Sequence, residues 1–175
     1  MNNEIATTST SKLAGRPKRG DRWATAYHEA GHTVASYFLG VPFERVTIVS
    51  DGTYGGAVYQ EPYEGNSVKR IRKEIIILLA GELAERASGL REWDNTFDRG
   101  EGFDLADIEN ALCRAYKTPE RRRQFMGEVR QEATELITSP EWLRAIKALA
   151  ATLYEVKELD YQQAVKAIRF AAYGE

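Results

Sequence analysis

Apolar side chains recur every three or four residues along most of this chain, the spacing that places them on one face of a helix. The first such run covers residues 23–39 and stops before Gly40, a residue that commonly ends helices. A second run begins after Asn66 or Ser67, either of which can cap a helix, and ends near Gly89. The pattern therefore predicts two long helices in the first half of the chain.

The second half of the chain is divided by helix-start signals. Thr118 and Ser139 each stand directly before a proline, so each hydroxyl can cap a helix whose first residue is that proline. Asp160 and Gln163 have the spacing of a capping box. We predict further helices over residues 103–113, 119–138, 140–157 and 160–171.

A short β-branched segment separates the two long helices. Residues 43–49 are typical of a strand, the Asp51-Gly52 pair is a turn signal, and residues 55–60 can return as a second strand. We therefore expect a mainly α (α+β) fold with a small β-hairpin or sheet beside the first helix and a C-terminal helical bundle. One edge of this hairpin offers a place for an extended peptide to pair.

The length and composition favour a single compact unit. The chain has 175 residues, and 43% of them are hydrophobic. Residues 1–20 contain few apolar side chains, so we predict a disordered tail there. We expect residues 21–175 to form one domain, with a site-bearing core over 21–116 and a C-terminal helical subdomain over 117–175.

Charge and cysteine content bear on the partners of the protein and on the compartment in which we expect it. The formal net charge of −2 argues against nucleic acid or anionic membranes as partners. No apolar run approaches the roughly 20 residues needed to span a bilayer, and the first residues lack the pattern of a signal peptide. The single cysteine, Cys113, excludes intrachain disulfides and fits a reducing compartment. We therefore expect a soluble, cytoplasmic protein without a membrane segment.

The first predicted helix contains the pattern His28-Glu29-x-x-His32, which uses the only two histidines of the chain. Residues four apart lie on one helix face with their Cβ atoms roughly 5–6 Å apart, so both imidazoles can reach one metal ion. Glu29 follows the first histidine directly, where a hydrolytic metal site needs a general base. The pattern predicts a zinc site, with Zn²⁺ as the cofactor and Glu29 as the catalytic residue.

Catalytic zinc usually has three protein ligands, and the composition leaves no histidine for the third. The candidates are the carboxylates of Glu82, Glu85, Asp104 and Asp107, with the thiol of Cys113 a poorer choice for an open hydrolytic site. Glu82 and Glu85 could instead support a ligating imidazole, although we expect them to be solvated surface acids. Asp104 can serve as a helix cap and Asp107 as a first-turn acid, so the residues alone leave the choice open.

Four segments occur in an order that resembles a known family. They are His28-Glu29-Ala30-Gly31-His32, Val46-Thr47-Ile48, Leu79-Ala80-Gly81-Glu82-Leu83-Ala84-Glu85 and Asp107-Ile108-Glu109-Asn110-Ala111. Together they look like the peptidase domain of the FtsH-type membrane-anchored ATP-dependent proteases, over about residues 22–171. The resemblance implies a helical zinc-metallopeptidase fold and the hydrolysis of peptide bonds.

The resemblance also implies roles for individual residues. In that family, two motif histidines and a distant aspartate bind zinc, and the motif glutamate is the catalytic base. Carried over to this sequence, the metal ligands are His28, His32 and Asp107, and the base is Glu29.

Asp107 fits the family pattern better than Asp104 does. The family's aspartate is followed by alanines four and eight residues later, as Ala111 and Ala115 follow Asp107. The segment before it departs from the pattern, because Gly102 stands one residue too far upstream.

The family's ATPase motif is absent from this sequence. No Gly-x-x-x-x-Gly-Lys-Ser/Thr phosphate loop occurs in the 175 residues. We therefore expect a stand-alone zinc metalloendopeptidase that lacks the AAA+ ATPase module and cleaves flexible or unfolded polypeptides without ATP of its own. A homo-oligomer and a separate ATPase partner are both left open. The alternative is a non-catalytic or regulatory metal-binding module that retains the peptidase fold.

Overall fold

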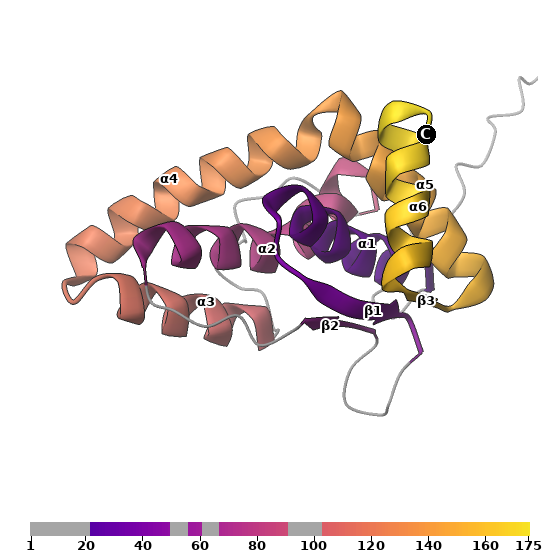
Figure 1. Ribbon diagram of the computed structural model, residues 1–175. Coiled ribbons are helices and arrows are strands. Elements are labelled where there is room, and N and C mark those ends of the chain that lie inside the picture. Colours follow the sequence, from indigo (N-terminus) through magenta and orange to yellow (C-terminus); the bar gives the residue numbers. More distant parts are fainter. Residues whose placement is uncertain (1–21, 50–55, 61–66, 91–102) are drawn as a thin grey trace, which may run out of the picture.

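The structure is a computed structural model that describes residues 22–49, 56–60, 67–90 and 103–175 (Figure 1). Its elements, in order, are α1 (Arg22–Leu39), β1 (Phe43–Thr47), β2 (Ala57–Gln60), α2 (Val68–Ala87), α3 (Phe103–Ala115), α4 (Pro119–Thr138), α5 (Pro140–Val156), β3 (Glu158–Asp160) and α6 (Tyr161–Tyr173). The predicted mainly helical fold with a small sheet is confirmed. The predicted tail over residues 1–20 and the Asp51-Gly52 turn lie outside the described residues.

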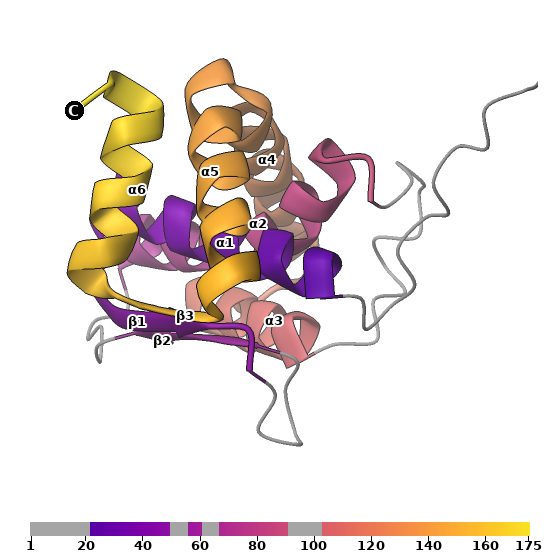
Figure 2. The same ribbon diagram turned by 90° about the vertical axis from the view of Figure 1, so that its right-hand side faces the viewer.

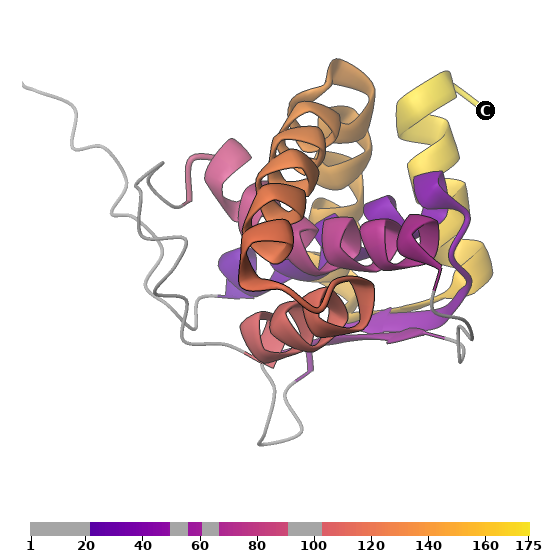
Figure 3. The same cartoon turned by 90° about the vertical axis from the view of Figure 1, so that its left-hand side faces the viewer.

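Helix α2 occupies the middle of the molecule, with α4 on one side of it and α3 on the other (Figures 1 and 3). Helix α1 packs along α2, and α5 packs on α1. Helix α6 stands beside α5 (Figure 2). On α2, the side chains of Ile71, Ile75, Leu79 and Leu83 are buried, whereas Leu78 is only partly buried.

Gly31 allows α1 and α2 to approach each other closely. A Cβ at position 31 would lie 2.8 Å from the Cβ of Ala84 and closer still to the carbonyl oxygen of Ala80. Real Cβ atoms essentially never come within 3.0 Å of such atoms, so a larger residue would push the helices apart. The close crossing brings the motif residues of α1 within side-chain reach of α2.

The sheet contains a strand that the sequence did not predict. Its order is β2-β1-β3 with both pairs antiparallel, and Val46 of β1 faces Val58 on one side and Leu159 on the other. Residues 158–160 were expected to be a link and a helix cap, because three residues are too few to show a strand pattern. Pairing with β1, which continues as a 2.8 Å bond from Ile48 N to Lys157 O, makes them a strand.

The predicted helix caps have mixed outcomes. Asp160 and Gln163 form the expected capping box, with bonds of 2.9 and 3.0 Å, and Ser67 caps α2. Helices α4 and α5 begin at Pro119 and Pro140 as predicted, but the hydroxyls of Thr118 and Ser139 make no capping bond, so that part of the prediction was wrong. Ser139 Oγ instead donates to the carbonyl oxygen of Leu136 at 2.7 Å, which satisfies the end of α4.

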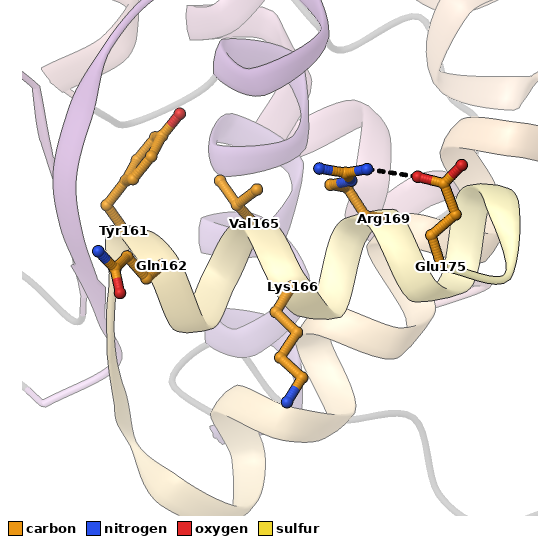
Figure 4. A pocket seen from close by; sticks show the side chains of 6 residues that line it. All are labelled: Tyr161, Gln162, Val165, Lys166, Arg169 and Glu175. Atoms are coloured by element: carbon orange, nitrogen blue, oxygen red, sulfur yellow. Dashed lines mark hydrogen bonds and ion pairs between the residues drawn. The ribbon is translucent and has the colours of Figure 1, made fainter.

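Two further observations concern a possible membrane crossing and the shape of the surface. None of the described helices combines the length and the apolar character that a membrane crossing requires. A groove of about 380 Å³ runs along α6, lined by Tyr161, Gln162, Val165, Lys166, Arg169 and Glu175 (Figure 4). None of the predicted site residues lines this groove.

Candidate metal centre

Helix α1 carries all three motif residues on the part of its surface that faces the interior. Glu29 and His32 are buried, and the His28 side chain is about a quarter exposed. The two imidazole rings lie edge to face with their centroids 4.6 Å apart. The four-residue spacing therefore brings both rings together, as the sequence predicted.

The two imidazoles point their Nε2 atoms toward Gly81 of α2. A Cβ placed on Gly81 would lie 2.5 Å from His32 Nε2 and 2.7 Å from His28 Nε2, so both nitrogens face one small volume. Gly81 does not adopt a left-handed φ, so the backbone conformation does not require glycine there. The missing side chain leaves the space into which both imidazole nitrogens are directed.

The opposite nitrogen of each ring has an acceptor from α2. His28 Nδ1 lies 2.6 Å from Glu85 Oε1, and His32 Nδ1 lies 2.7 Å from the carbonyl oxygen of Ile77. A carbonyl oxygen can only accept, so His32 carries its proton on Nδ1, and Nε2 is then the nitrogen of the neutral ring that can bind a metal. Acceptors behind ligating histidines are typical of zinc sites, so these residues fit the predicted cofactor.

Glu85 is therefore not the solvated acid that we expected. Its spacing with Ile77 and Gly81, four residues apart along α2, places all three on one helix face. That spacing was the signal for this role, but only the crossing of α1 and α2 shows that the face meets the histidines. Because Glu85 binds Nδ1, it supports His28 from the side opposite to Gly81.

The other candidate ligands lie in different surroundings. Glu82 pairs with the buried guanidinium of Arg86 at 2.6 Å, so it too is engaged rather than merely solvated. Cys113 is exposed on α3, within 3.4 Å of a Glu109 carboxylate oxygen. The side chain of Asp104 lies outside the described part of the structure.

Asp107 lies in the first half of α3, with its side chain exposed. The buried residues Ile108, Ala111 and Leu112 hold α3 in the core, and α3 packs against α2. Among the residues that the structure describes, no group of three His, Cys, Asp or Glu side chains forms a metal-binding cluster. Asp107 as the third ligand therefore stays a prediction.

Glu29 packs against the first residue before β2. A Cβ on Gly56 would lie 2.7 Å from Glu29 Cγ, 2.8 Å from Glu29 Oε1 and 2.9 Å from the carbonyl oxygen of Thr47. The side chain of the predicted base thus lies between α1 and the start of β2. Sequence reasoning did not identify Gly56.

The region around the motif is similar to a known protein family. Residues 17–89 match the sequence model of peptidase family M41, a segment that contains α1, the β1–β2 pair and α2. The match covers 73 of the 175 residues, so this chain is similar to that family over the motif region. The matched segment includes the two histidines, Glu29 and the supporting Glu85.

Two curated relatives that this chain resembles carry the name ATP-dependent zinc metalloprotease FtsH. The protein of Magnetococcus marinus is 37% identical over 84 residues, which are 42% of this chain and 12% of the relative. The protein of Ruminiclostridium cellulolyticum is 34% identical over 95 residues, which are 48% of this chain and 15% of the relative. The matched segment is thus a small part of each relative's length, and the family match ends before α3.

Proposed function

We propose that this chain is a zinc metalloendopeptidase that hydrolyses peptide bonds in flexible or unfolded polypeptides. The observation that carries this proposal is the convergence of His28 Nε2 and His32 Nε2 on the space beside Gly81, with both Nδ1 atoms bound to acceptors. Glu29 lies on the same helix, one residue from His28. The names of the curated relatives support the same activity.

Each of the proposed site residues would have a separate role in the reaction. His28 and His32 would hold zinc through Nε2, and Asp107 would be the third ligand. Zinc in such a site supplies Lewis-acid polarisation of the scissile carbonyl and makes water a better nucleophile near neutral pH. Glu29 would accept a proton from the attacking water and deliver it to the leaving amine nitrogen.

The supporting acceptors have a chemical role in this proposal. A carboxylate behind His28 makes that imidazole a stronger ligand and fixes its ring orientation, and the Ile77 carbonyl does the second of these for His32. Glu29 is almost fully buried, so its carboxylate has few alternative orientations. The chain would thus hold both proposed ligands and the proposed base in place before substrate arrives.

The position of β2 supports an extended polypeptide as the substrate. In the described sheet β2 is an edge strand, and Gly56 at its start touches Glu29. A peptide that added to this edge by backbone hydrogen bonds would run beside the base. No phosphate loop occurs in the 175 residues, so we infer that any ATP-driven unfolding depends on residues outside them.

The test compares the wild-type chain with the Glu29→Gln variant. Zinc content is measured by atomic absorption, and cleavage is measured with fluorescein-labelled casein as the unfolded substrate. We expect about one zinc per chain in both proteins and cleavage only in the wild type. Zinc binding with equal cleavage in both proteins would refute Glu29 as the base. Zinc binding without cleavage by either protein would favour the regulatory module.

A further inference from the structure

Gly56 is the point at which the sheet touches the predicted base. A Cβ at this position would lie within 3.0 Å of three atoms: Glu29 Cγ, Glu29 Oε1 and the Thr47 carbonyl oxygen. Two of these atoms belong to the Glu29 side chain, and the third belongs to the neighbouring strand. The α-carbon of Gly56 therefore fills the space beside the Glu29 carboxylate without room for a further methyl group.

Backbone conformation does not explain why this residue is glycine. Among the described residues, the glycines with positive φ are Gly40, Gly89 and Gly174, and Gly56 is not one of them. An alanine could therefore adopt the same backbone. What an alanine could not do is keep the present distance to Glu29. The requirement is for space next to one particular side chain.

The partners of this contact differ in their freedom to move. The Thr47 carbonyl belongs to β1, the central strand, which pairs with β2 and β3. The Glu29 side chain is attached through rotatable bonds, so it can be displaced more readily than a backbone carbonyl in a strand that is paired on both sides, although its burial makes that displacement costly. A methyl group at position 56 would therefore be accommodated mainly by displacement of the Glu29 carboxylate.

We propose that Gly56 is a positioning residue for catalysis, which sets the location of the Glu29 carboxylate by admitting no side chain at the start of β2. The inference rests on the proposed role of Glu29 as the base. It assigns the β1–β2 pair a part in the chemistry that is separate from any pairing with substrate. Displacement of a catalytic group by about 1 Å is enough to lower a rate constant about 100-fold.

The contact itself is tested by thermal unfolding of the full chain, without reference to activity. The four proteins are wild type, Gly56→Ala, Glu29→Ala and the double variant. Gly56→Ala should lower the Tm by about 2–10 °C in the presence of Glu29 and by much less in the Glu29→Ala background. An equal loss in both backgrounds, or no loss in either, would overturn the proposal.

The positioning role is tested by steady-state kinetics on labelled casein. Gly56→Ala should lower kcat about 10- to 100-fold, with KM changed less than twofold and zinc content unchanged. Gly127→Ala is the matched control, because a Cβ at Gly127 meets nothing within 4 Å, and it should retain wild-type kcat. A wild-type kcat in Gly56→Ala would overturn the proposal. If the wild type has no activity, the proposed function fails while the unfolding cycle still decides whether Gly56 positions Glu29.

Discussion

Glu85 Oε1 of α2 lies 2.6 Å from Nδ1 of His28 on α1, and this bond joins the two helices directly behind a predicted metal ligand. The carboxylate is mostly buried, with 18% of its side chain exposed. An anion in this position strengthens the imidazole as a ligand and selects the ring orientation in which Nε2 faces Gly81.

The first prediction concerns this bond. Glu85→Gln keeps the shape of the side chain but removes its charge, so the affinity for zinc should fall roughly 10- to 100-fold. Competition with a fluorescent zinc chelator measures the change. Glu74→Gln is the control, because Glu74 is on the same helix in a surface ion pair with Arg114. Equal affinities in wild type and Glu85→Gln would show that the bond has no role in metal binding.

The second prediction concerns the space beside Gly81. An alanine methyl would lie within 2.7 Å of both Nε2 atoms, so Gly81→Ala should abolish stoichiometric zinc binding. The helix itself should tolerate alanine, which has a higher helix propensity than glycine by about 1 kcal/mol. Circular dichroism should therefore report an unchanged helix content, while atomic absorption reports the loss of metal. Retention of one zinc per chain would contradict the convergence of the two nitrogens.

The third prediction separates packing from metal binding. Gly31→Ala would place a methyl group against the Ala80 carbonyl and Ala84 Cβ, atoms that cannot rotate away. The free energy of unfolding should fall by about 1–3 kcal/mol, measured by urea denaturation in the presence of a metal chelator. Gly127→Ala should have the opposite sign, a gain of up to about 1 kcal/mol. A neutral Gly31→Ala variant would mean that the helices cross less closely than described.

The fourth prediction decides the third ligand. Asp107→Asn should weaken zinc binding by more than the roughly 100-fold upper range for supporting residues, because it removes a direct ligand. Glu109→Gln, an exposed acid on the same helix, should leave the affinity unchanged. If Asp104→Asn weakens binding and Asp107→Asn does not, the assignment of Asp107 is wrong.

The sequence predicted the features of the fold that depend on residues close together in the chain. The motif helix, the Ser67 cap and the Asp160 capping box each depend on residues within one helical turn, and all three are present in the structure. Local signals also misled, because a hydroxyl before proline at position 139 can bond backward to the preceding helix instead of forward. Either bond satisfies a terminal backbone group, and the sequence does not rank them.

The sequence did not predict features that depend on contacts between residues far apart in the chain. Strand β3 exists because Leu159 meets Val46, more than one hundred residues earlier, and its three residues show no pattern of their own. The role of Glu85 depends on how closely α1 approaches α2, which Gly31 determines. Its carboxylate looks like any helix-surface acid until the partner helix is in place.

The late position of β3 has a consequence for the order of assembly. Strand β1, whose Thr47 carbonyl lies beside Gly56, has its second neighbour only when residues 158–160 are available. A nascent chain, or one shortened before residue 158, contains both histidines and Glu29 but an incomplete sheet behind the base. The sheet beside the predicted base is therefore completed only by residues more than one hundred positions after β1.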